Sequence, residues 1–164
     1  ILSAPMLQIN TSPYPESIAY AAAQTLTWFW QGESYAPGRG PYYTETFEEQ
    51  SLTQSEARYA MGEAKLAANP ALRLGGPTNR WLAESIWATW KAGWDAKKLT
   101  MPVILFQASN DQIVNPGRQT SICADAVNCQ LVTLAGAEHE LLVETDSVRD
   151  IVLNHIHTFV NSNR

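Results

Sequence analysis

The sequence predicts an α/β fold organised on a parallel sheet, and two short apolar runs carry this prediction. Residues 102–107 are rich in Val, Ile and Leu and are apolar on both faces, as expected of a strand buried inside a parallel sheet. Residues 130–134 form a second such strand. A helix is expected after each run, and the order strand, helix, strand, helix implies parallel pairing with right-handed crossovers.

The beginning of the chain predicts one more core strand, over residues 1–9. This stretch is apolar and short, and it ends at the polar residues 10–12 and at Pro13. The chain starts with Ile1 rather than Met, and the start resembles the middle of a strand. Such a start is typical of a fragment or of a processed product.

Helix positions follow from apolar spacing and from capping residues. Residues 17–30 place apolar side chains on one helical face. A capping box at residues 53–56 predicts a helix that runs to about Ala68. Thr78 is expected to cap a further helix, which ends near Gly93 and has a strongly aromatic face.

Two helices are expected in the last third of the chain. Asn115 followed by Pro116 is typical of a helix start, and this helix should end near Val127. The last helix should start at residues 145–146. Its expected buried stripe consists of Val148, Ile151, Val152, Ile156, Phe159 and Val160.

The aromatic residues divide the chain near Asp95. All six Trp lie between Trp28 and Trp94. After Trp94 the only aromatic residues besides His are Phe106 and Phe159. We therefore expect a core strand over 1–9, a helical lobe over 10–95 and a C-terminal α/β segment over 96–164. The Trp side chains could fill an irregular helical core or line an apolar pocket for a lipid-like substrate, and composition favours neither.

Composition and charge exclude several classes of protein. The net charge of −5, without any run of Lys or Arg, argues against a nucleic-acid partner. No stretch of 18 apolar residues predicts a membrane span. Cys123 and Cys129 could form a disulfide, but two reduced thiols in a cytoplasmic protein are the favoured interpretation. Neither Cys has a His at ligand spacing, so no metal or other cofactor is expected.

Two residues with catalytic chemistry follow the two predicted strands. Asp111 comes after the first strand and His139 after the second, and the carboxyl ends of parallel strands are where sites form. A carboxylate that orients an imidazole is the acid–base part of a catalytic triad. Each residue alone would more often be a turn or surface residue, and Glu138 or Glu140 could compete for the ring. His155 and His157 are expected to lie on the helix surface, near its C-terminus.

At these residues the sequence resembles the α/β-hydrolases. Residues 102–114 look like their acid-bearing strand and loop, and residues 136–144, Gly-Ala-Glu-His-Glu-Leu-Leu-Val-Glu, look like their histidine loop. Residues 69–81 are similar to the cap of bacterial lysophospholipases of the monoacylglycerol-lipase-like group, and residues 2–6 resemble the strand after the nucleophile helix. The resemblance covers nearly the whole chain.

The resemblance implies a serine ester hydrolase that acts on lysophospholipids or monoacylglycerols. Asp111 would be the triad acid, His139 the triad base and the lobe over 10–95 an inserted helical cap. The nucleophile elbow Gly-x-Ser-x-Gly does not occur in these residues, so the Ser would lie upstream and the chain alone would be inactive. An esterase on non-lipid substrates and a non-catalytic hydrolase remnant that binds lipid or a partner are the alternatives.

The sequence also leads to expectations about partners and location. The expected partners are a lipid-like ester substrate and either the N-terminal half of the same hydrolase or a second copy, paired along an open sheet edge. The expected location is the cytoplasm, with peripheral contact at the inner membrane as an option.

Overall fold

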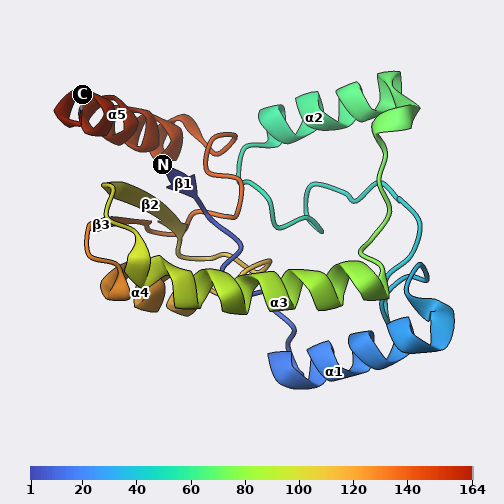
Figure 1. The fold of residues 1–164 in the computed structure, drawn as a ribbon. Coiled ribbons are helices and arrows are strands. Elements are labelled where there is room, and N and C mark those ends of the chain that lie inside the picture. Colours follow the sequence, from blue (N-terminus) through green and yellow to red (C-terminus); the bar gives the residue numbers. More distant parts are fainter. Residues whose placement is uncertain (164) are drawn as a thin grey trace.

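The computed structural model describes residues 1–163 as a three-stranded parallel sheet with helices on both faces (Figure 1). Arg164, which ends the predicted C-terminal segment, lies outside the described residues. The strand order is β1-β2-β3, and both pairings are parallel. The expected α/β fold with a parallel sheet is therefore confirmed.

The elements follow the predicted order closely. Besides α-helices and strands, the structure contains three short helical turns, labelled η. In chain order the elements are β1 (Leu2–Ser3), α1 (Glu16–Leu26), η1 (Thr27–Gln31), α2 (Glu56–Ala68), η2 (Pro70–Leu72), α3 (Asn79–Asp95), η3 (Ala96–Lys98), β2 (Val103–Ala108), α4 (Pro116–Asp125), β3 (Cys129–Leu134) and α5 (Asp146–Ser162).

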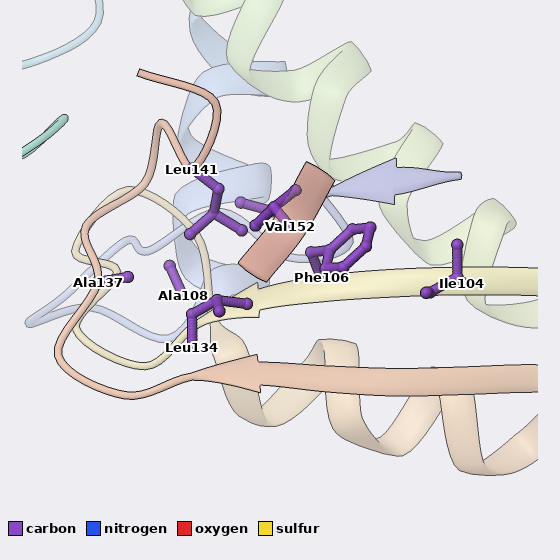
Figure 2. Packing of buried hydrophobic residues seen from close by; sticks show 8 residues of the cluster. Ile104, Phe106, Ala108, Leu134, Ala137, Leu141 and Val152 are labelled. Carbon is purple, nitrogen blue, oxygen red and sulfur yellow. The ribbon is translucent and has the colours of Figure 1, made fainter. Parts of the chain in front are cut away.

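The main core lies between the sheet and α5. Alternate residues of β2 point to this face, and Figure 2 shows them packed with residues from β3, the following loop and α5. The fully buried members of the cluster are Ile104, Phe106, Ala108, Ala137, Leu141 and Val152. Burial of this apolar surface is the main favourable contribution to folding of the sheet.

The predicted stripe of α5 is partly wrong. Val152 is buried, and Val148, Ile156 and Phe159 pack against the core. Ile151 and Val160 are exposed instead, because a helix on a three-stranded sheet buries only a narrow face. His155 is half-buried, and its ring meets Phe106 edge-on at 6.2 Å, so it is not the surface residue we expected.

The opposite face of the sheet packs on α4 through a buried polar residue. The Gln107 side chain donates to the Pro116 carbonyl at 2.6 Å and to the Thr120 hydroxyl at 2.9 Å. Thr133 on β3 donates to the Gln107 oxygen at 3.0 Å. Because both ends of this amide have partners, its burial costs little.

Two predicted helix caps are confirmed. Thr78 Oγ1 accepts from the backbone N–H of Trp81 at 3.2 Å, and Asn115 Oδ1 accepts from that of Arg118 at 3.3 Å. The box at residues 53–56 does not cap α2, because the residue before the helix is Ser55, which makes no side-chain cap. Thr53 instead accepts from the Ser55 amide and donates to the Val143 carbonyl at 2.8 Å.

Strand β1 is shorter than the nine residues predicted. Ala4 adopts a positive φ of 38° and Pro5 has no amide hydrogen, so regular pairing stops after Ser3. Ile9 makes one isolated antiparallel bridge to Val114. The chain thus returns to the Asp111 loop after the strand has ended.

The helical part of the chain is built on α1 and α3, which lie side by side (Figure 1). Tyr20 packs on Trp90 with ring centroids 4.9 Å apart, and the Trp90 indole donates to Glu16 at 2.7 Å. Trp87 and Trp94 are largely exposed, so the aromatic face of α3 is only partly core. The boundaries at residues 10 and 95 stay a prediction.

The two cysteines form a disulfide across the turn between α4 and β3. Cys123 is bonded to Cys129 with Cα atoms 5.3 Å apart. The preference for two reduced thiols is therefore wrong, because the end of α4 and the start of β3 bring the two side chains together. The cytoplasmic location, which rested partly on reduced thiols, stays a prediction.

Within residues 1–163, no helix is both long and apolar enough to cross a membrane.

Candidate functional site

The structure brings Asp111 and His139 together at the carboxyl ends of β2 and β3. The Asp111 side chain is fully buried, and one oxygen, Oδ1, accepts from the backbone N–H groups of Ile113 and Val114 at 2.9 and 3.0 Å. The other oxygen, Oδ2, lies 2.8 Å from Nδ1 of His139. The carboxylate is thus fixed by its own loop before it meets the imidazole.

This pairing defines the orientation of the His139 ring. A proton on Nδ1 is donated to Asp111, which leaves Nε2 free to accept a proton in the neutral ring. The His139 side chain is 20% exposed, whereas Asp111 is closed off, so only the histidine faces solvent. Neither Glu138 nor Glu140, the two competing acids, takes the ring nitrogen; Glu138 instead accepts from Asn110.

The electrostatics of the pair favour a charged acid and a more basic imidazole. Burial opposes ionisation of Asp111, but the hydrogen bonds from His139 and from two backbone amides outweigh it and lower the pKa of Asp111 below its ordinary 3.8. The hydrogen bond to Asp111 raises the pKa of His139 above its ordinary 6.5, against the opposing effect of burial. The pair is therefore suited to hold a proton on Nε2 transiently.

The histidine loop is anchored in the core on both sides of the ring. Ala137 and Leu141, two residues before and two after His139, are fully buried (Figure 2). Ala108 at the end of β2 is buried in the same cluster. The packing that stabilises the sheet therefore also limits the movement of the imidazole.

A buried carboxylate that the sequence did not assign a role also holds this loop. Glu144 is fully buried, and its Oε1 accepts from the backbone N–H groups of Glu138 at 2.9 Å and Gln54 at 3.2 Å. Its Oε2 accepts from the Thr145 amide at 2.8 Å. Three amide donors satisfy the charge that burial would otherwise penalise. The signal in the sequence was an acid that ends an apolar run directly before a helix start.

The segment 52–58 forms what we call the loop clamp, a set of hydrogen bonds to residues 136–146. Besides the bonds of Thr53 and Gln54 already given, the Gln54 side chain donates to the Gly136 carbonyl at 2.6 Å, and Glu140 N donates to the Leu52 carbonyl at 2.7 Å. Arg58 adds hydrogen bonds to the Glu144 carbonyl and to Asp146. The clamp ties the start of α2 to the histidine loop across more than 80 residues of sequence.

No nucleophile completes this pair within the described residues. Among residues 1–163, no serine hydroxyl is hydrogen-bonded to His139. Ser109, the serine that follows β2, accepts from the Gly136 amide at 2.7 Å and so has a structural role. The described residues also contain no cluster of three or more acidic, His or Cys side chains that could hold a metal ion.

An apolar cavity of about 480 Å³ opens between α1, the loop at residues 36–39 and the start of α3. Its wall includes Ile9 and Asn10, which connect directly to the Asp111 loop: Ile9 bridges Val114, and Asn10 donates to the Gln112 carbonyl at 2.9 Å. Other lining residues are Ile18, Trp81 and Leu82, together with the charged Arg39. The cavity could hold an apolar chain next to the acid-bearing loop.

A second cavity of about 480 Å³ lies at the opposite end of the sheet, between the starts of β2 and β3 and the end of α5. It is lined by residues such as Val103, Cys129 and Phe159 and is distant in the fold from the Asp111 loop. Because sites in parallel sheets form at the carboxyl ends of strands, the first cavity is the better candidate.

Known proteins show the same architecture. The structure of a monoglyceride lipase variant from Saccharomyces cerevisiae superposes with a TM-score of 0.71 at 20% identity, over 99% of this chain and 55% of that one. A monoacylglycerol lipase from Paleococcus ferrophilus gives a TM-score of 0.70 at 16% identity, over 99% and 58% of the two chains. The chain therefore has an α/β-hydrolase fold, as the sequence resemblance implied.

Curated relatives match at the level of sequence. The probable lysophospholipase L2 of Haemophilus influenzae is 32% identical over 131 residues, which is 80% of this chain and 42% of the relative. Lysophospholipase L2 of Escherichia coli K12 is 30% identical over 156 residues, covering 87% and 45% of the two chains. The chain thus spans less than half the length of these relatives. The family described as serine aminopeptidase S33 (Hydrolase_4) matches residues 1–146, and this chain belongs to that family of α/β-hydrolases.

Proposed function

We propose that this chain forms the cap and the acid–base part of a serine ester hydrolase that cleaves the acyl ester of lysophospholipids or monoacylglycerols. The observation that carries the proposal is the 2.8 Å contact between Asp111 Oδ2 and His139 Nδ1 at the ends of adjacent parallel strands. The serine and the oxyanion hole would come from residues upstream of this chain, so the chain alone would be inactive.

In this proposal His139 Nε2 takes the proton of the serine hydroxyl while the serine oxygen bonds to the ester carbonyl carbon. Asp111 holds the ring and stabilises the positive charge that the proton brings. The same proton then passes to the leaving glycerol oxygen as its bond to the acyl carbon breaks. A water molecule repeats the cycle on the acyl-serine and releases the fatty acid.

The substrate class follows from the apolar cavity and from the relatives. The cavity beside the Asp111 loop is lined mainly by apolar side chains, which suits an acyl chain. The relative from Escherichia coli is named a lysophospholipase, and two structural neighbours are named monoglyceride or monoacylglycerol lipases. The N-terminal half of the hydrolase would pair with β1, which has β2 on one side only in the described sheet.

The test uses the full-length protein with lysophosphatidylcholine, a monoacylglycerol, and short- and long-chain p-nitrophenyl esters. His139→Ala should lower kcat by about four orders of magnitude or more, because the general base is lost. The matched control is His157→Ala. This ring lies on the exposed face of α5, and Asn161 is its only hydrogen-bond partner among residues 1–163.

The outcomes separate the alternatives. A loss below about tenfold for His139→Ala would remove this residue from the mechanism. Turnover of short esters alone would favour an esterase on non-lipid substrates. Absence of turnover by the full-length protein, with lipid binding intact, would identify a non-catalytic remnant.

A further inference from the structure

The cavity beside the Asp111 loop contains one charged side chain in a mainly apolar wall. Residues of α1 and α3 such as Ile18, Ala22 and Leu82 form the apolar part of this wall. Among residues 1–163, Arg39 is the only charged residue that lines the cavity, and it comes from the loop between η1 and α2. A guanidinium in such a setting is stabilised by an anion. Arg39 therefore marks the place where an anionic group of a ligand would bind.

Arg39 has no acidic partner within the described chain. No Asp or Glu side chain among residues 1–163 forms a salt bridge with it. Each of the other three arginines within residues 10–95 has a partner: Asp146 for Arg58, Glu33 for Arg80 and the ring of Tyr42 for Arg73. The arginine that lines the cavity is thus the one whose charge is left for a ligand.

A tight turn presents Arg39 to the cavity. The Arg39 backbone N–H donates to the Ala36 carbonyl at 2.9 Å. Pro37 and Gly38 stand between them, and Gly38 has a positive φ of 77°. This is the pattern of a type II turn, which takes Pro at its second and Gly at its third position. The backbone of Arg39 is therefore held in place before any ligand binds.

The Gly-Gly-Pro run before α3 holds this turn from outside. The Ala36 N–H donates to the Pro77 carbonyl at 2.9 Å, and the Gly76 N–H donates to the Gly40 carbonyl at 2.8 Å. A Cβ atom on Gly76 would lie only 2.9 Å from the Cβ of Arg39. Only glycine at position 76 lets the stem of Arg39 pack this closely on the chain before α3.

The two proposed substrates differ in the group that Arg39 would recognise. A lysophospholipid carries a phosphate diester on its glycerol, whereas a monoacylglycerol carries no charge. A guanidinium binds phosphate oxygens through two parallel N–H donors. The phosphate and the acyl ester share one glycerol, so a cavity with an apolar wall and a single cation suits the phosphate-bearing substrate.

We propose that Arg39 binds the headgroup phosphate of a lysophospholipid and so makes the enzyme select this substrate over a monoacylglycerol. The proposal rests on the proposed function, because it names the residue that recognises the substrate of that same site. The chain carries a net charge of −5, which attracts no anion from a distance. The local contact with Arg39 must therefore supply the preference.

The test compares lysophosphatidylcholine and a monoacylglycerol with the same acyl chain as substrates of the full-length protein. Arg39→Gln should raise KM for lysophosphatidylcholine by about tenfold or more with kcat unchanged, because the contact is made equally before and during the reaction. KM for the monoacylglycerol should stay within about twofold. Arg39→Lys should give an intermediate KM, because it keeps the charge and loses the paired donors.

The matched control for charge is Arg73→Gln. It removes the same charge from the same region, but Arg73 does not line the cavity, so KM should change for neither substrate.

A glycine pair tests the presentation of Arg39. Gly76→Ala should displace the Arg39 stem and raise KM for lysophosphatidylcholine, whereas Gly62→Ala, with nothing within 4 Å of the added Cβ, should not. In the Arg39→Gln background, Gly76→Ala should raise KM no further, because both changes act through one side chain.

A binding measurement separates this proposal from the proposed reaction. In the full-length protein with His139→Ala, calorimetry gives the affinity for both lipids without any turnover. Adding Arg39→Gln should weaken binding of lysophosphatidylcholine by about tenfold and leave binding of the monoacylglycerol unchanged. This result is expected even if the protein hydrolyses neither lipid.

Three results would overturn the proposal. Arg39→Gln could leave binding and KM of lysophosphatidylcholine unchanged. It could weaken both lipids equally, which would make Arg39 a structural residue of the cavity. It could relieve inhibition by free fatty acid and leave KM for lysophosphatidylcholine unchanged, which would make the product carboxylate the occupant.

Discussion

Residues 96–163 and residues 10–95 differ in how they bury their side chains. In β2 five of six residues are buried, and every alternate one joins the core under α5. In contrast, α1 buries only Ala23 and α2 buries none of its residues, so the buried positions of residues 10–95 lie mainly on α3. The first region is a packed frame, whereas the second is a set of helices with large exposed aromatic surfaces.

This difference suggests that the two regions have different roles: residues 96–163 fix the geometry of Asp111 and His139, whereas residues 10–95 contribute to substrate binding. Asp111 and His139 both stand on the frame, where a change of packing would move them. The helical region meets the histidine loop through the polar loop clamp instead of through apolar packing. We therefore expect changes in the frame to affect catalysis and changes in the helical region to affect binding.

The largest effect should come from Asp111→Asn in the full-length enzyme. The amide cannot hold the ring in the same tautomer, so kcat should fall by about 10⁴ with folding largely kept. The matched control is Asp146→Asn, which removes an exposed acid that pairs with Arg58 in the loop clamp. Equal losses in the two variants would show that the contact of Asp111 with His139 has no special part in catalysis.

The next effect should come from Glu144→Gln, where the frame meets the loop clamp. The amide cannot accept from three backbone N–H groups as the carboxylate does, so the free energy of unfolding should fall by about 1–3 kcal/mol. A less fixed histidine loop should also lower kcat while leaving KM nearly unchanged. Chemical denaturation and steady-state kinetics measure both quantities.

A neighbouring variant provides the control for Glu144→Gln. Glu140 lies on the same loop but is exposed, so Glu140→Gln should change the stability by much less than the buried substitution. If both variants were equally stable, Glu144 would have no anchoring role.

The pH dependence of the free energy of unfolding should reflect the interaction between Asp111 and His139. The pKa of His139 is raised above 6.5, so its stabilising contribution is complete below pH 6.5 and is lost as pH rises through the higher folded value. The pKa of Asp111 is lowered below 3.8, so its contribution is present above pH 3.8 and is lost as pH falls through the lower folded value. The contact between Asp111 and His139 should therefore stabilise the fold most between pH 3.8 and pH 6.5.

Activity should depend on the protonation of His139 in the opposite way to stability: it should increase as the ring loses its proton. Only neutral His139 can accept a proton, so kcat/KM of the full-length enzyme should rise with pH through a midpoint above 6.5. Asp111→Asn removes the group that raises this pKa and should move the midpoint of the residual activity to lower pH. An unmoved midpoint would assign the titration to another group.

Much of the frame could be predicted from the sequence, because local signals there agree with the packing. The continuous apolar run at 102–107, the Asn115-Pro116 start and the separation of Asp111 from His139 all led to the observed elements, although β2 is shifted by one residue from that run. The limits of strand β1 depended on the backbone of Ala4, and the exposure of Ile151 on the width of the sheet. Pro5 in the segment 1–9 was a local signal for the early end of β1, whereas nothing within α5 itself encodes the exposure of Ile151.

The polar residues that hold the histidine loop, Glu144 and Thr53, were harder to predict than Asp111 and His139 themselves. Glu144 has partners at positions 54, 138 and 145, and a carboxylate held across 90 residues gives no local pattern. Thr53 looked like a helix cap, but its hydroxyl donates to Val143 instead. In the helical region, spacing located α3 correctly but did not reveal that Trp87 and Trp94 stay largely exposed.

The smallest predicted effects compare one helix cap in each region. Thr78→Ala removes the cap of α3 and Asn115→Ala that of α4, and each should cost about 1 kcal/mol. Because few residues of α1 and α2 are buried, we expect calorimetry of the full-length protein to resolve a lower transition, shifted by Thr78→Ala, and a higher one, shifted by Asn115→Ala. A single transition shifted equally by both substitutions would mean that the loop clamp and the contact of α1 with α3 make one cooperative unit of the two regions.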